Sequence, residues 1–123
     1  MSTQANLLVI RSHDIERAVH FYQQLGLQFC RHAHGSGPEH FACDFGSFVF
    51  EIYPARDPDD STSAVRIGFC VDDIEQAVVR LKEIGAQVVS PLKESEWGRR
   101  AVVEDLDGHT IELVANPVRF DVG

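Results

Sequence analysis

The sequence has little cysteine, no long apolar run and few basic residues, and each scarcity narrows what the chain can be. Its three cysteines are an odd number without a CxxC pair. We therefore expect Cys30, Cys43 and Cys70 to be buried free thiols in a reducing cytoplasm, rather than a disulfide or a metal cluster. No apolar stretch approaches the roughly 20 residues that cross a bilayer. The first residues carry no basic signal-peptide segment, so we expect a cytoplasmic protein.

The scarcity of basic residues also bears on partners. The chain has 11 Lys and Arg against 19 Asp and Glu, a formal net charge of −8. Nucleic acids and anionic membrane surfaces carry negative charge and repel such a protein, so we expect neither as a partner. At 123 residues with 44% apolar side chains, the chain is long enough for one domain, residues 1–123, with its own core.

An internal repeat organises this domain. The segment Asp14–Val19 recurs as Asp73–Val78, and the shared offset continues to the pair Gly26 and Gly85. Apolar residues recur in both copies with the 3.6-residue period of an amphipathic helix, which each glycine ends. In the second copy, Asp72 followed three residues later by a glutamate predicts the start of the helix.

Strand-like runs surround both helices. They span residues 7–11, 28–32, 40–45 and 48–53 in the first copy, and 64–71, 87–89, 100–104 and 110–115 in the second. Turn-forming residues separate the runs, including Ser90-Pro91. Each copy therefore predicts the order β-α-β-β-β. The fold class is α+β, with two tandem βαβββ modules, residues 5–53 and 64–116, joined by the polar linker 54–63.

Strand alternation predicts which side chains share the face opposite the helices. Glu51 and Glu112 occupy matching positions in the last strand of each module, and Tyr53 lies on the same face as Glu51. Arg66 and its repeat mate Leu7 lie on the corresponding face of the first strands. A buried carboxylate is costly unless a cation neutralises it. The pattern indicates either a structural Glu–Arg–Glu network or a pocket whose charges meet a ligand.

Three segments then carry a family resemblance: residues 14–22, Phe50-Glu51-Ile52, and residues 104–113 with their Asp-Gly turn. Over residues 6–116 the chain resembles the vicinal oxygen chelate superfamily, the group of glyoxalases, bleomycin resistance proteins and extradiol dioxygenases. The resemblance implies curved mixed sheets around a small-molecule cavity between the modules. It also implies a homodimer.

The resemblance further implies four metal-ligand positions, which fall on Leu7, Glu51, Arg66 and Glu112. Leucine offers no lone pair, and arginine is a fixed cation without an acceptor. Two carboxylates alone are too few ligands for Zn, Ni or Fe. We therefore predict no cofactor, with a divalent metal as the less favoured alternative.

Histidines elsewhere could complete such an alternative site. His32 and His34 share one face of a short strand, and His40 follows a glycine-containing loop. Solvated histidines on an exposed edge strand are the favoured interpretation. His109 lies beside a turn on the helix side, so we do not expect it to be catalytic.

The sequence leaves two functions open, a binding protein and an enzyme. The first is a glyoxalase- or bleomycin-resistance-like protein that binds a small molecule without metal, with Leu7, Tyr53, Arg66, Trp97 and Arg100 as ligand-binding residues; Arg99 is an alternative to Arg100. The second is a lyase, isomerase or epimerase acting on an α-hydroxy-carbonyl or acyl substrate. Its proton-abstracting base would be Glu112 or Glu51, with Arg66 stabilising the enolate.

Overall fold

The computed structural model describes residues 1–96 and 98–115, and they form two compact units, Met1–Thr62 and Ser63 onward. Each unit has the element order β-α-β-β-β and contains one four-stranded mixed sheet. The α+β class and the two modules predicted from the repeat are thus confirmed.

Unit 1 contains β1 (Leu7–Ser12), α1 (Ile15–Gln23), β2 (Cys30–His32), β3 (His40–Asp44) and β4 (Val49–Pro54). Its strands lie in the order β1-β4-β3-β2. β1 and β4 are parallel, and the other neighbours are antiparallel. Helix α1 packs against β1, β3 and β4, so the opposite face of the sheet, called here the open face, carries no helix of this unit.

Side chains along β4 point alternately to the core beneath α1 and to the open face. Phe50 and Ile52 are buried beneath α1, whereas Glu51 and Tyr53 between and beyond them are partly exposed on the open face. The Tyr22 ring from α1 meets Phe50 edge-on at a centroid distance of 5.1 Å. Such edge-to-face pairs add to the stabilisation that burial of the rings provides.

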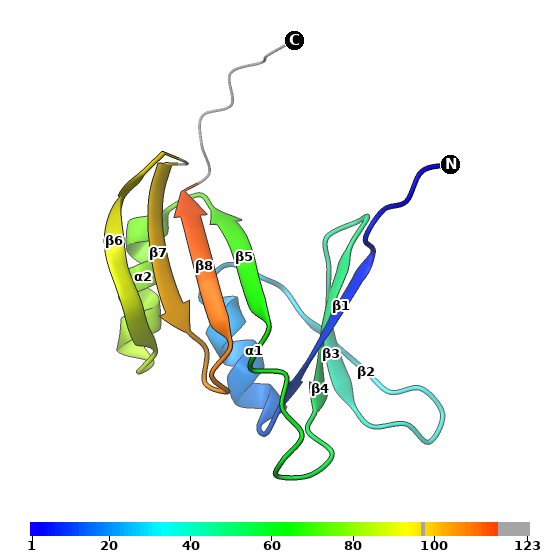
Figure 1. Cartoon of the computed structure of the whole chain (residues 1–123). Helices are drawn as coiled ribbons and strands as arrows, with labels where there is room; N and C mark the ends of the chain where they lie inside the picture. The colour runs from blue at the N-terminus through cyan, green and yellow to red at the C-terminus, as the bar shows by residue number, and fades with distance from the viewer. Residues whose placement is uncertain (97, 116–123) are drawn as a thin grey trace. The chain divides into compact units, whose positions relative to one another are not determined.

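Unit 2 contains β5 (Arg66–Val71), α2 (Ile74–Glu83), β6 (Gln87–Ser95), β7 (Gly98–Glu104) and β8 (Thr110–Ala115). The strand order β5-β8-β7-β6 repeats that of unit 1, with β5 parallel to β8 (Figure 1). Helix α2 contacts β6, β7 and β8. The buried side chains Ile111 and Leu113 alternate in β8 with Glu112, which is only partly buried.

Strand β6 is longer than the sequence predicts. Ser90-Pro91 was expected to form a turn, but the strand continues through it to Ser95. The pairing register with β7 shifts on both sides of Ser90. Proline lacks the N–H that a ladder requires and is tolerated in edge strands and at bulges. β6 is an edge strand of its sheet and its register shifts there, so the proline does not end it.

The two helices begin at equivalent aspartates. The Asp14 carboxylate accepts a hydrogen bond from the Arg17 N–H at 3.1 Å, and Asp73 accepts one from the Gln76 N–H at 3.0 Å. These bonds satisfy amide groups that the first helical turn leaves without a partner. The expected start at Asp72 is therefore wrong by one residue.

The cysteines correct another expectation. Cys43 is buried on the helix side, where burial raises the pKa of its thiol. Cys30 and Cys70 are exposed, because strand alternation turns both toward open faces. The expectation of three buried thiols is therefore wrong for two of them.

Neither described helix has the length and apolar character that crossing a membrane demands; this statement covers residues 1–96 and 98–115.

Candidate functional site

A row of ring-bearing and basic side chains crosses the open face of unit 1 from strand to strand. His32 of β2 lies opposite His40 of β3, and Tyr53 of β4 lies opposite Arg11 of β1. The His40 and Tyr53 rings stack with centroids 4.1 Å apart and planes 7° apart. The Arg11 guanidinium lies 5.2 Å from the centre of the Tyr53 ring, within the range of a cation–π contact. The row fixes the side chains of β3 and β4 at one end of the open face.

Next to this row lies a pocket of about 540 Å³. The register places Ala42 between Cys30 and Glu51, and the small alanine leaves room above the sheet. The pocket is lined by Gln28, Cys30, His32, Ala42, Asp44, Val49 and Glu51. All of these residues belong to unit 1. The two carboxylates of the pocket, Asp44 and Glu51, have apolar surface between them and suit a ligand that carries positive charge or hydrogen-bond donors.

Glu51 meets a buried histidine rather than an arginine. Its Oε2 atom lies 3.3 Å from Nε2 of His40, whose residue is only 1% exposed. His40 was expected to be solvated, and that expectation is wrong, because β3 is an inner strand and the ring is covered by Tyr53. His32 and His34 are exposed, as expected.

Glu112 in unit 2 has a different environment. One carboxylate oxygen accepts a 2.6 Å bond from Nε of Arg66, and the other pairs with the Arg100 guanidinium. The Arg66 hydrogen bond lowers the pKa of Glu112, partial burial opposes this, and the charge of Arg100 lowers it further. A carboxylate with a lowered pKa and both oxygens engaged is a weak proton acceptor. Glu112 is therefore poorly suited to the role of catalytic base.

The two neighbouring arginines of β7 point to opposite faces. Arg100 reaches Glu112 on the open face, whereas Arg99 pairs with Glu75 of α2 and lies 3.6 Å from Glu94. The structure thus places Arg100, the residue chosen from the sequence, on the open face. It also shows that Arg66 does not neutralise Glu112 alone, which the sequence did not predict.

Leu7 and Trp97 were also predicted to bind the ligand. Leu7 is 52% exposed and lies beside Val49 of the pocket wall in the sheet register. Trp97 lies outside the described residues.

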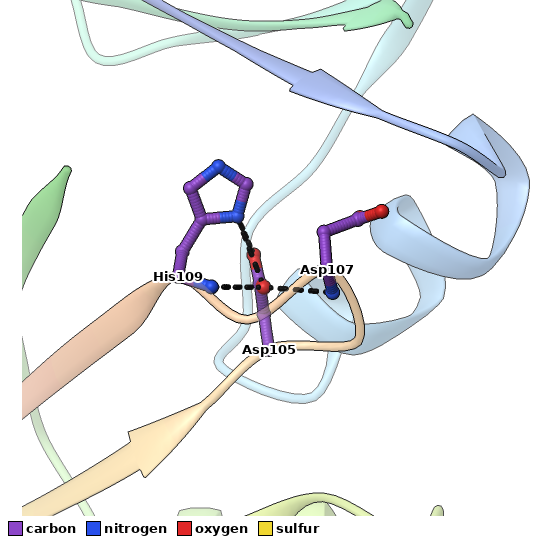
Figure 2. A group of neighbouring side chains, drawn as sticks. All are labelled: Asp105, Asp107 and His109. Atoms are coloured by element: carbon purple, nitrogen blue, oxygen red, sulfur yellow. Dashed lines mark hydrogen bonds and ion pairs between the residues drawn. The ribbon is translucent and has the colours of Figure 1, made fainter. Parts of the chain in front are cut away.

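A third polar group closes the turn between β7 and β8. The ligand atoms of Asp105, Asp107 and His109 lie within 4.8 Å of one another (Figure 2). Asp105 accepts bonds from the N–H groups of Asp107 and His109, at 3.0 and 2.9 Å, and lies 2.8 Å from the His109 ring nitrogen Nδ1. Both Asp105 and His109 are buried. These bonds hold the turn together, so we interpret the group as structural.

The fold and the open faces define the class of protein. A sequence model of the Glyoxalase/Bleomycin resistance protein/Dioxygenase superfamily matches residues 4–113, and the chain belongs to this family. A search of curated proteins gives no significant match.

Solved structures with the same fold come from several bacteria. TnmS3, an antibiotic binding protein from Streptomyces sp. CB03234, is 24% identical, with a TM-score of 0.73 over 93% of this chain and 96% of that one. A glyoxalase/bleomycin resistance protein from the same strain is 25% identical, with a TM-score of 0.69 over 91% and 99%. Hypothetical protein SA1046 from S. aureus is 21% identical, with a TM-score of 0.72 over 94% and 95%.

The metal ion of the family's metal-dependent members does not fit the residues of this chain. Of the four equivalent positions, Leu7 provides no donor atom, and the Arg66 side chain is a cation already bonded to Glu112. The Glu112 carboxylate is in turn engaged by two arginines. A divalent ion would have to displace both guanidinium groups and find further ligands.

Proposed function

We propose that the chain binds a small, positively charged molecule on the open face of unit 1, without the metal ion that the family's lyases and dioxygenases use. The supporting observation is the pocket of about 540 Å³ with Asp44 and Glu51 in its wall. This volume is in the range of ordinary small-molecule sites. The description of one structural neighbour as an antibiotic binding protein is consistent with this class of ligand.

The charge balance of the pocket supports a cationic ligand. Glu112 has two arginine partners, whereas in the described part of the chain Glu51 lies within ion-pair distance of the His40 imidazole and of no arginine or lysine. A carboxylate without a fixed cation gains the most from a ligand that supplies one. We therefore assign the ligand's positive group to Glu51 and its apolar part to the surface of Ala42 and Val49.

The test is a calorimetric screen of metal-free bleomycin and other cationic antibiotics against uncharged compounds of similar size, with EDTA present throughout. Glu51→Gln removes the charge with little change of shape and should weaken binding by about tenfold, or about 1.4 kcal/mol. Glu83→Gln, an exposed change on α2, is the matched control and should leave binding unchanged. Preference for uncharged compounds, or equal binding by both variants, would contradict the proposal.

A lyase, isomerase or epimerase is the second candidate function. The difference between the partners of Glu51 and those of Glu112 indicates which of the two would be its base. Among the described residues Glu51 pairs with an imidazole and not with an arginine or lysine, so its oxygens are less engaged than those of Glu112 and it is the better placed proton acceptor. The assay is exchange of the α-hydrogen of α-hydroxy ketones in D₂O, followed by NMR. Enzymatic exchange that Glu51→Gln abolishes and Glu112→Gln retains would support this function over simple binding.

A further inference from the structure

Three histidines gather on the open face of unit 1, outside the four family positions. The ring centroids of His32, His34 and His40 lie 6.0, 5.9 and 5.4 Å apart in the pairs 32–34, 32–40 and 34–40. His32 is the last residue of β2 and pairs with His40 of β3, and His34 follows two residues after the strand ends, with its ring near both. Clustered imidazoles repel one another when protonated, so a partner that favours their close approach has to be identified.

The two ring nitrogens of His40 indicate what that partner is, because each lies beside an oxygen atom. Nδ1 lies 3.3 Å from the Pro38 carbonyl oxygen, and Nε2 lies 3.3 Å from Glu51 Oε2. A neutral imidazole has one N–H donor, so one nitrogen must present a lone pair to an oxygen acceptor. If Nδ1 donates to Pro38, the lone pair of buried Nε2 faces a carboxylate. Within the described part of the chain, Nε2 has no hydrogen-bond partner of acceptable geometry.

A cation between Nε2 and the carboxylate removes this conflict. Metal–ligand bonds of about 2.0–2.1 Å in a tetrahedral Zn²⁺ site separate neighbouring ligand atoms by about 3.3 Å. The His40–Glu51 separation equals that spacing. A proton would also relieve the conflict, but it would make no use of the two further imidazoles, whereas a metal ion needs such additional donors.

We propose that unit 1 binds a divalent transition metal ion, with Nε2 of His40 and a carboxylate oxygen of Glu51 as fixed ligands and the imidazoles of His32 and His34 completing the set. The fixed pair is held by strand pairing and by the stack of His40 on Tyr53. The ion enters through the pocket, whose wall includes His32 and Glu51.

Binding requires movement of the two exposed rings. The His32 ring is stacked at 21° to that of His40 instead of converging on its Nε2 atom. Among residues 1–96 and 98–115, only Asp105, Asp107 and His109 bring three ligand atoms within 4.8 Å. Because His32 and His34 are exposed, their side chains can turn toward the fixed pair, at the cost of the ring contacts that they make with His40 and with each other.

The site is distinct from the family's metal position, with which it shares only Glu51. It uses the carboxylate assigned above to the ligand's positive group, so the ion and that ligand would compete, and the titration is made without the ligand. The experiment is calorimetric titration of untagged, EDTA-treated and dialysed protein with ZnCl₂ and with NiCl₂. We expect one ion per chain. His32→Ala and His34→Ala, both exposed substitutions, should each weaken Zn²⁺ affinity about tenfold or more. Two-dimensional NMR of the imidazole C–H groups should show shifts for these rings and His40 on addition of Zn²⁺.

Two control variants locate the ion. His20→Ala removes an exposed histidine of α1, and Asp107→Asn alters the turn between β7 and β8; neither should change Zn²⁺ affinity. Absence of binding by the folded wild-type protein at tens of micromolar Zn²⁺ would overturn the proposal and leave a proton as the cation beside Glu51. Binding that persists unchanged in both histidine variants, or is lost in Asp107→Asn, would overturn it as well.

Discussion

Replacement of Asp105 by alanine should be among the most destabilising changes in unit 2. The substitution removes the acceptor for two backbone N–H groups and for the ring of His109, which is 0% exposed. A buried donor left without a partner costs about 1–3 kcal/mol, and the N–H of Asp107 is only partly buried and costs less. The expected loss is therefore about 3–5 kcal/mol, a large share of the roughly 5–15 kcal/mol that stabilises a typical domain.

Urea unfolding followed by circular dichroism measures this loss. With a slope of about 1–3 kcal/mol per molar urea, the midpoint for Asp105→Ala should fall by about 2 M. Asp105→Asn keeps an oxygen for the backbone donors but loses the charge-assisted bond to the ring, and should cost about 1–2 kcal/mol. Asp59→Ala, in the exposed linker, should stay within about 0.5 kcal/mol of wild type. A loss below about 1 kcal/mol for Asp105→Ala would show that the turn does not depend on this carboxylate.

Three further predictions concern pH, thiols and assembly. Because the pKa of Glu112 is lowered by folding, its stabilising effect is present above the ordinary value of 4.5 and is lost as pH falls through the lower folded value. Glu112→Gln should therefore lose less stability than wild type in urea titrations between about pH 5 and pH 3; parallel curves would contradict this. Cys30 and Cys70 should react rapidly with a thiol reagent in the folded protein, and Cys43 only on unfolding, as counted by mass spectrometry. We also expect a homodimer, because each sheet has open edge strands that twofold pairing can cover; a monomer by light scattering at micromolar concentration would refute it.

The fold could be predicted because its signals are local and repeated. The helical stripe and terminal glycine occur twice, and both Gly26 and Gly85 adopt positive φ values, 90° and 86°. Alternation in β4 and β8 placed Glu51 and Glu112 on open faces without any knowledge of strand order. The extent of β6 could not be predicted in the same way, because the effect of Pro91 depends on whether its strand is an inner or an edge strand.

The partners of the two glutamates depend on strand pairing, which the sequence does not state. His40 shares its face with Ala42 by alternation, but only the register of β3 against β4 brings it to Glu51. A signal was present in the segment His40-Phe41-Ala42-Cys43-Asp44, whose three consecutive apolar residues are typical of an inner strand. Interpreted in that way, the segment would have predicted a buried histidine. For Glu112, the side-by-side pairing of β7 and β8 similarly brings in Arg100.

The parallel pairing of the first and last strand in each unit also constrains how the chain folds. β1 pairs with β4 and β5 with β8, so each sheet joins segments about 40 residues apart, and one of its two inner strands, β4 or β8, is the last to be made. Contacts between distant segments slow folding, because the intervening chain must be ordered before they form. During synthesis from the N-terminus, β1 must therefore wait for β4 to leave the ribosome, with β2 and β3 already present as an exposed hairpin. Chaperone dependence should then be greatest in that interval, and a substitution in β4 should slow folding more than one in β2.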